Sequence, residues 1–206
     1  MKPDRIALFP LEVILFPGVL LPLHIFEPRY KLMIGRCLEN HLEFGVILAK
    51  SEGIVPVGCT AEIVKLVKRY SDGRMDILTS GQTPYRVLEL FDDQPYLEAN
   101  VEFLDDDTRP GTASTEQKLL KLYEQCHTLI YGRPPQLPDP ASTFSLAFQI
   151  AGELPLDLDY KQELLEMRVE TERQASLLAR MEEWFPQLVR LDQVRQRAGG
   201  NGHGLK

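Results

Sequence analysis

Three kinds of catalytic machinery are recognisable from residue type and spacing: a phosphate-binding loop, a nucleophile elbow, and a cluster of cysteine and histidine residues. Nucleotide hydrolysis needs a glycine-rich loop ending in Gly-Lys-Ser/Thr, because its amides and its lysine hold the phosphates. No Gly-Lys pair occurs among the 206 residues, and no Gly-x-Ser-x-Gly nucleophile elbow occurs either. The residues therefore predict neither an ATPase nor a hydrolase of that type.

Cysteine and histidine residues are the other candidates, as metal ligands or as a nucleophile with its base. Cys37 and His41 are four residues apart, but no Cys-x-x-Cys or His-x-x-x-His motif occurs. Cys126 directly precedes His127, and adjacent helical side chains point about 100° apart, which suits neither catalysis nor metal binding. We therefore expect no catalytic residue, no cofactor and no metal site, with Cys37 and Cys126 as small core residues.

His24, Glu27 and Arg29 form a polar group at the end of an apolar stretch. As a catalytic base in a barrel pocket, His24 would need an orienting partner such as Glu27, which leaves a small-ligand enzyme as one alternative. A strand histidine bonded to the backbone is the favoured interpretation. Glu27 and Arg29 have two possible roles. In one they line a binding surface; in the other Glu27 caps the positive end of the next helix and Arg29 pairs with a nearby carboxylate.

Four basic residues surround one predicted hairpin and raise the alternative of RNA binding: Lys65, Lys68, Arg69 and Arg74. Asp72 and Asp76 dilute this charge, and Tyr70 is the only nearby aromatic residue for base stacking. The whole chain has 23 Lys and Arg against 30 Asp and Glu, a net charge of −7, which disfavours binding to phosphates. We therefore expect no nucleic acid partner, and a solvated hairpin.

His24, Glu27 and Arg29 lie within the stretch Ile6–Met33, which is the most apolar in the chain. Pro10, Pro17 and Pro22 lack amide donors and would break a bilayer helix, so we expect no membrane span. Glu12 and Pro17 also interrupt any signal-peptide core. Three widely spaced cysteines and the absence of a glycosylation sequon fit reduced thiols in the cytoplasm.

The same stretch predicts a strand–turn–strand–helix unit that begins with a hairpin. Phe16-Pro17-Gly18-Val19 suits a type II turn between two short strands, and Pro22 confines the second strand to an edge, a strand end or a bulge. Glu27-Pro28 starts a helix with proline at its first position. Residues at helical spacing give it one buried face: Tyr30, Met33, Ile34, Cys37 and Leu38.

Further strands follow as far as Leu104, and helices follow from Ser114 onward. Strands are expected at 43–49, 59–70 with a bulge near Val64, 74–80, 84–91 and 96–104, with a turn at 71–73. So many strands in about a hundred residues imply a closed or nearly closed sheet. Ser114, Ser142 or Thr143, and Asp159 are the expected helix N-caps, and Pro186 is expected to interrupt a last helix that resumes to about Arg197. The fold class is α+β, with a β-rich subdomain at 1–108, a helical subdomain at 109–198 and a disordered tail at 199–206.

Three motifs in this order resemble the Lon substrate-binding (LON N-terminal) domain family. They are Phe9-Pro10-Leu11 through Phe26-Glu27-Pro28-Arg29-Tyr30; Val57–Ile63 with Asp72-Gly73 and Leu78–Gly81; and Lys161–Met167 with Glu172-Arg173. The resemblance implies a PUA-like pseudo-barrel followed by a small helical bundle. Full-length Lon-type proteases add an ATPase module and a Ser–Lys peptidase after this domain, and this chain ends where those would begin. We therefore expect a stand-alone, non-enzymatic member.

An apolar surface remains as the candidate functional site. The segment 13–21 is apolar on both strand faces, where burial of one face would leave polar residues on the other. Either the helical half covers it, or it stays exposed to bind unfolded or partner polypeptides by apolar contact and strand addition. A role linked to proteolysis is one alternative for such binding. The candidate site residues are Ile14, Phe16, Pro17, Leu20, Leu21, His24, Glu27, Arg29 and Tyr30. A weak homodimer is left open.

Overall fold

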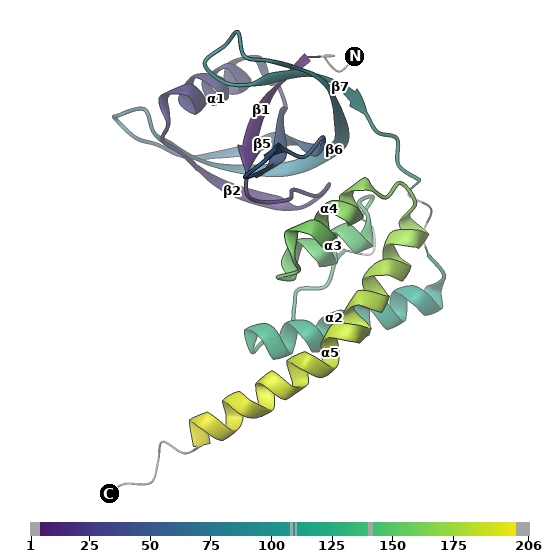
Figure 1. Ribbon diagram of the computed structural model, residues 1–206. Helices are drawn as coiled ribbons and strands as arrows, with labels where there is room; N and C mark the ends of the chain where they lie inside the picture. Colours follow the sequence, from purple (N-terminus) through teal and green to yellow (C-terminus); the bar gives the residue numbers. More distant parts are fainter. Residues whose placement is uncertain (1–4, 108, 110, 140–141, 201–206) are drawn as a thin grey trace, which may run out of the picture. The chain divides into compact units, whose positions relative to one another are not determined.

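The computed structural model describes residues 5–107, 109, 111–139 and 142–200, and these form two compact units (Figure 1). Unit 1 comprises Met1–Asp107 and Thr143–Arg168, and unit 2 comprises Thr108–Ser142 and Val169–Lys206. The change from strands to helices near residue 108 therefore coincides with a unit boundary. The helical half divides differently from the expected 109–198 subdomain, because residues 143–168 belong to the unit that contains the sheet.

Unit 1 is built on seven strands that form one sheet. The strands are β1 (Arg5–Leu11), β2 (Leu20–Ile25), β3 (Phe44–Lys50), β4 (Gly53–Ile54), β5 (Val57–Arg69), β6 (Met75–Phe91) and β7 (Glu98–Phe103). Neighbours follow the order β1-β7-β6-β5-β3, and a parallel pairing of β1 with β3 closes this path into a ring. Side chains from all sides of the ring fill its interior, including Leu8, Ile47, Tyr85 and Ala99. The expected α+β class and closed sheet are confirmed.

The expected strand–turn–strand segment is present, but its two strands do not pair. Val19 N–H donates to Phe16 O at 3.1 Å and Gly18 has φ 78°, as a type II turn requires. However, β1 pairs with β3 and β7, whereas β2 pairs with β6 and, within the described residues, with no other strand. Residues 12–19 thus carry the chain from the ring to a different strand, and reading the segment as a hairpin is wrong.

Five helices complete the fold. They are α1 (Pro28–Asn40), α2 (Ala113–Tyr131), α3 (Leu146–Glu153), α4 (Leu158–Glu166) and α5 (Glu170–Gly200). α1 begins at Pro28 as expected and buries Tyr30, Met33, Ile34 and Cys37. The N-caps of α2, α3 and α4 are Thr112, Ser145 and Asp157, each a two- or three-residue shift from the expected cap. In each case a hydroxyl or carboxylate oxygen accepts from the amide three residues later, which neighbouring polar residues in the sequence could equally have done.

Unit 2 pairs α2 with α5 around a core that includes Tyr123, Cys126 and Met181. Helix α5 continues through Pro186, where the sequence predicts an interruption. Pro186 and Glu182 are both exposed, so the carbonyl that loses its partner can be solvated. The helix reaches Gly200, two residues into the expected tail, and residues 201–206 lie outside the described part. Among the described residues, no helix has both the length and the apolar content needed to cross a bilayer.

Candidate polypeptide-binding surface

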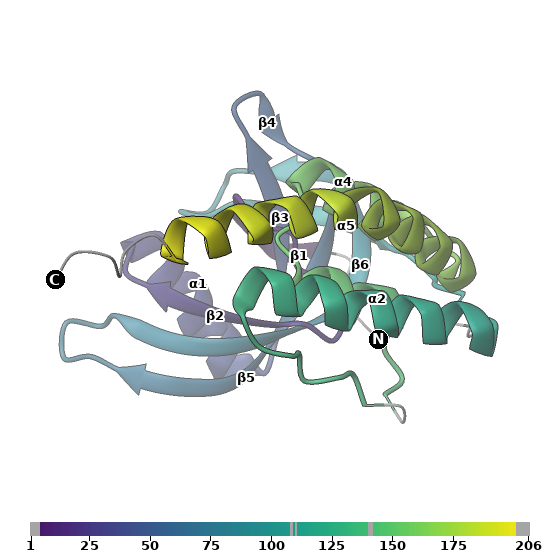
Figure 2. The same ribbon diagram turned by 90° about the horizontal axis from the view of Figure 1, so that it is seen from below.

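In unit 1, β2 and the adjoining halves of β5 and β6 form a three-stranded ribbon, which we call the arm (Figure 2). It comprises Leu20–Ile25, residues 63–69 and residues 75–80. Met75, Ile77 and Thr79 of its central strand are buried, and the residues between them are not. Because side chains alternate across a strand, one face of the arm belongs to the core and the other, its outer face, is open to solvent.

The outer face of the arm carries a set of apolar and charged side chains whose positions follow from the strand register. It comprises Leu20, Pro22, His24, Val64, Lys65, Val67, Lys68, Asp76, Leu78 and Ser80. Leu20 and Val67 are each 57% exposed and Val64 is 47% exposed. Phe26, directly after β2, is 59% exposed and stacks against the His24 ring. These are large apolar groups left in water on one face of a sheet whose other face is core.

Two bulges place both valines on this face. The pairing of β5 with β6 shifts register between Ile63 and Lys65 and again between Leu66 and Lys68. At such a bulge two consecutive residues oppose one residue of the partner strand. Val64 and Lys65 therefore face Leu78, and Val67 and Lys68 face Asp76. The sequence predicts the first irregularity near Val64, and the structure confirms it.

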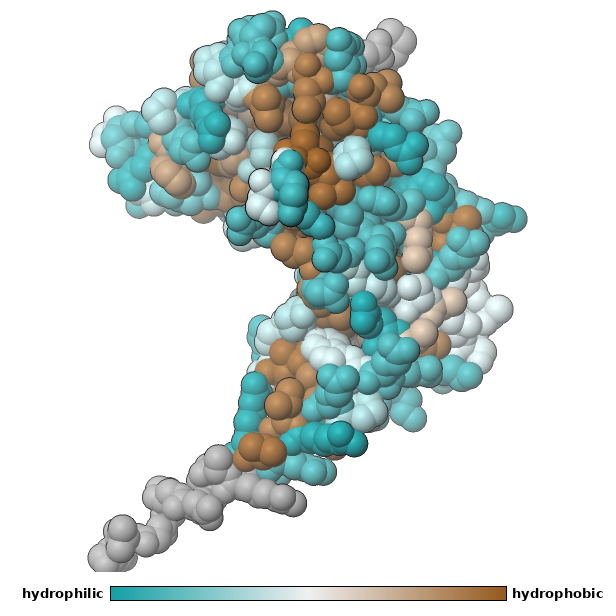
Figure 3. Space-filling model, in the orientation of Figure 1, coloured by the Kyte–Doolittle hydropathy of each residue, from teal (hydrophilic) through white to brown (hydrophobic). Residues whose placement is uncertain are grey.

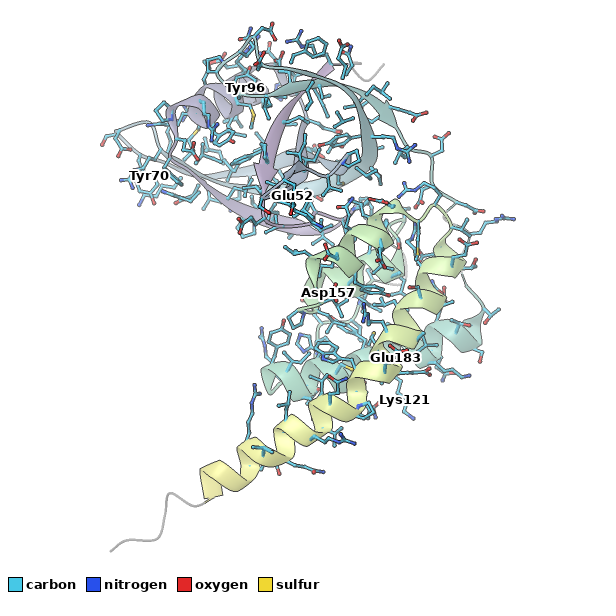
Figure 4. The ribbon with its side chains drawn as sticks, in the orientation of Figure 1. Glu52, Tyr70, Tyr96, Lys121, Asp157 and Glu183 are labelled. Atoms are coloured by element: carbon cyan, nitrogen blue, oxygen red, sulfur yellow. The ribbon has the colours of Figure 1, made fainter. Side chains whose placement is uncertain are left out.

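A polar cluster lies near the tip of the arm, around Tyr70 (labelled in Figure 4). His24 Nδ1 lies 2.6 Å from Asp76 Oδ1, and the Tyr70 hydroxyl donates to Asp76 Oδ2 at 2.8 Å. The hydrogen bond from His24, followed by that from Tyr70, lowers the pKa of Asp76 below its usual 3.8. Among the described residues, the His24 ring thus pairs with the Asp76 side chain, neither with the backbone, as the favoured interpretation predicts, nor with Glu27. Glu27 instead accepts from Arg29 Nε at 2.9 Å and makes no side-chain cap to α1.

The turn that precedes β2 is sealed, in contrast to the arm. The Phe16 ring is fully buried and stacks on Phe148 of α3, with centroids 4.9 Å apart. Gly18 N–H donates to Gly81 O at 2.9 Å, and Gly81 N–H donates to Val19 O at 3.0 Å. The turn is therefore held between β6 and α3, both within unit 1.

The nine predicted site residues divide into three groups by exposure. Leu20, His24 and Arg29 are exposed; Ile14, Leu21 and Glu27 are half-buried; Phe16, Pro17 and Tyr30 are buried. Their role in binding stays a prediction. Val64, Val67 and Leu78 were not among the predicted site residues. In β5, the apolar residues that break the alternation of buried and exposed positions could have indicated the two valines.

A second apolar region of unit 1 lies over the barrel, where Figure 3 shows hydrophobic residues gathered on the face in view. Ile54, Val87, Leu97 and Phe103 are partly buried and pack against the core inside the ring of strands. These residues therefore belong to the packing of the core, and they leave less apolar surface for a partner. The arm instead presents its apolar groups across three neighbouring strands of one sheet face, which suits an extended chain better.

The small-ligand alternative gains little from the cavities of unit 1. A cavity of about 380 Å³ is lined by Arg36, Tyr96 and Cys37 among others, and one of about 580 Å³ is lined by Lys50 and Asp159 among others. His24 lines neither. Burial raises the pKa of the Cys37 thiol to about 11, so at neutral pH it is protonated and a poor nucleophile. The described residues hold no group of three potential metal ligands.

Curated proteins with similar sequences include Lon proteases. The Lon protease of Escherichia coli K12 is 30% identical over 227 residues, covering 96% of this chain and 28% of that protein. The Lon protease of Cytophaga hutchinsonii is 25% identical over 198 residues, covering 87% of this chain and 24% of that protein. The chain thus spans about a quarter of the length of these curated relatives.

Solved structures show the same fold. The crystal structure of a Lon N-terminal domain protein from Xanthomonas campestris aligns with a TM-score of 0.64 at 23% identity, covering 85% of this chain and 97% of that one. The N-terminal domain of the Lon protease of the Mycobacterium avium complex aligns with a TM-score of 0.61 at 16% identity, covering 86% and 98%. The family model of the ATP-dependent protease La (LON) substrate-binding domain matches residues 5–183, most of the sequence. The chain therefore belongs to the family of LON substrate-binding domains.

Proposed function

We propose that this protein binds unfolded or apolar segments of other polypeptides, without catalysis, on the outer face of the arm. The observation that carries the proposal is the exposure of Leu20, Val64 and Val67 together on one face of a three-stranded sheet. Membership of a family of substrate-binding domains supports a recognition role. In this proposal the domain holds a client chain in the cytoplasm, and any cutting of that chain is done by another module.

Binding on this face rests on apolar contact. Burying a Leu or Val side chain against a client contributes roughly 1.5–3 kcal/mol, and ordering a flexible client offsets part of this. The affinity should accordingly be modest. Strand addition, the other expected mode, is opposed at β2, because Pro22 has no N–H to offer an incoming strand. The exposed stretch of β5 carries two bulges and two lysines, features that also disfavour edge pairing.

Isothermal titration of the full chain against a reduced, alkylated model protein tests the proposal, with the disulfide-intact folded form as control. We expect heat only with the unfolded form. The double variant Leu20→Ser/Val67→Ser should weaken binding about tenfold or more, because two apolar contacts are removed. Leu191→Ser/Val194→Ser is the matched control, since these α5 residues of unit 2 are 57% and 62% exposed.

Three results would overturn the proposal. Equal and negligible heats for the folded and unfolded forms would remove the binding function altogether. Equal losses in the arm variant and the α5 control would show that the effect is not specific to the arm. A loss in Leu88→Ser/Leu90→Ser, with the arm variant unchanged, would place binding on the exposed end of β6 near the barrel instead.

A further inference from the structure

We propose that the outer face of the arm selects client segments with a defined pattern: an apolar residue, two acidic residues and a second apolar residue at alternate positions. This inference rests on the proposed function and adds a client class to it. It follows from the order of side chains along the arm and from the state of its two lysines.

Four rows of side chains cross the outer face, as the register sets them. Leu20, Ser80 and the exposed Glu62 form the first row, and Leu78 with the Val64–Lys65 bulge forms the second. Glu62 would repel a client carboxylate, so the first row takes an apolar residue. Asp76 with the Val67–Lys68 bulge forms the third, and Phe26, beyond β2, supplies the last. Rows two residues apart on a strand are about 6.8 Å apart, and an extended client repeats its own same-face side chains at that spacing. A client lying over β6 would thus have Leu20 and Phe26 on its β2 side and Lys65 and Lys68 on its β5 side, at successive facing positions.

Within the described part of the chain the two lysines are not tied up in ion pairs, whereas neighbouring charges are, although the Lys68 ammonium lies over the Tyr70 ring at 4.4 Å. Arg74 donates to Asp72 at 2.7 Å, and Asp76 is held by His24 and Tyr70. Among the residues that the structure describes, neither Lys65 nor Lys68 makes a salt bridge. Each lysine follows an exposed valine at its bulge, so a carboxylate bound there would have apolar neighbours that partly shield it from water, which strengthens the attraction.

The positive charges of Lys65 and Lys68 favour a client with acidic residues on the outer face of the arm. The chain as a whole carries a net charge of −7 and repels acidic segments at long range. The two lysines offer a local attraction that such segments gain only when they lie in register with the arm. Selection would therefore depend on the phase of the acidic residues as well as on their number.

RNA, which also carries regularly spaced negative charge, fits the surface less well. Stacking of bases on aromatic rings is a main source of affinity for single strands. The Tyr70 ring already contacts Lys68 at 4.4 Å, Arg74 at 4.9 Å and the edge of His24. A base could stack on Tyr70 only by displacing these groups, which leaves the exposed ring of Phe26 for stacking. A client carboxylate, in contrast, can bind the Lys68 ammonium while it stays over the Tyr70 ring.

Two fluorescein-labelled peptides of identical composition test the inference by anisotropy with the full chain. The in-phase peptide contains Leu-Ser-Glu-Ser-Glu-Ser-Leu, and the out-of-phase peptide contains Leu-Glu-Ser-Ser-Ser-Glu-Leu, both between the same neutral flanks. We expect the in-phase peptide to bind about fivefold to tenfold more tightly, as two partly exposed ion pairs allow. This preference should shrink as salt is raised.

Matched variants locate the effect. Lys65→Gln/Lys68→Gln should abolish the preference, whereas Lys118→Gln/Lys121→Gln, which changes two exposed lysines of α2, should keep it. The reversal Lys65→Glu/Lys68→Glu should transfer the preference to an in-phase peptide with Lys in place of Glu. All of these positions are exposed, so the variants should fold.

Each contrary outcome has a distinct meaning. Equal binding of both peptides, with the unfolded model protein still bound, would overturn this inference and leave the proposed function standing. Failure to bind either the peptides or the unfolded protein would remove both. An oligouridine that binds more tightly than the in-phase peptide and is lost in Lys65→Gln/Lys68→Gln would replace the peptide client with RNA.

Discussion

Residues 15–19 and 20–26 are neighbours in one mostly apolar stretch, yet the first group is sealed and the second is open. Phe16 is buried against Phe148, whereas Leu20 and Phe26 have more than half of their surface in water. The difference arises from what packs on each part: β6 and α3 clamp the turn, and only one face of β2 meets the core. Apolar character alone therefore does not separate a structural segment from a binding surface.

The largest expected effect comes from opening the sealed part. Phe16→Ala should lower the free energy of unfolding by about 3–5 kcal/mol, because it removes a fully buried ring and leaves a cavity beside Phe148. Leu20→Ala, four residues later, should change it by no more than about 0.5 kcal/mol. Urea unfolding followed by the fluorescence of unit 1 tyrosines measures both. Similar losses in the two variants would mean that the two parts are not distinct.

A smaller effect is expected from the glycine in the turn. Gly18 has φ +78°, and a Cβ built there would lie 2.5 Å from Phe144 Cγ, so Gly18→Ala should destabilise the protein by about 1–3 kcal/mol. Gly35→Ala in α1 is the matched control. It meets no atom within 4 Å and should stabilise by up to about 1 kcal/mol. The midpoint of thermal unfolding should fall for Gly18→Ala and rise for Gly35→Ala. A shift in the same direction for both would contradict the close packing of the turn against α3 and β6.

The smallest effect concerns the open part and depends on pH. The pKa of Asp76 is lowered in the folded state, so its contribution to stability is complete above the usual 3.8 and is lost as pH falls through the folded pKa. His24→Ala removes the largest cause and should raise the pKa of Asp76 toward 3.8. Carboxyl chemical shifts followed by NMR report this directly. An unchanged pKa in the variant would show that the His24–Asp76 contact is not maintained in solution.

Local patterns predicted local structure well. Pro17-Gly18 gave the turn type, Pro28 gave the start of α1, and the phase change in β5 gave a bulge near Val64. Each of these depends on a few adjacent residues whose backbone preferences are strong.

Long-range partners could not be predicted in the same way. The turn is held by Gly81 and Phe148, more than sixty residues away, and nothing near Phe16 in the sequence specifies them. The error about the hairpin has the same origin, since β2 finds its partner in β6 rather than in β1. For the same reason the candidate site contained Phe16, which proved buried, and lacked Val67, which proved exposed.

Pro22 and the two bulges of β5 affect how the arm would release what it holds. An unfolded chain that pairs backbone to backbone with a sheet edge can recruit further strands and grow into an aggregate. Both flanks of the arm lack a regular ladder of free donors and acceptors, because one has a proline and the other has broken register. A chain held only by its side chains leaves its own backbone solvated. It can therefore dissociate, or be pulled away, without having served as the seed of a fibre.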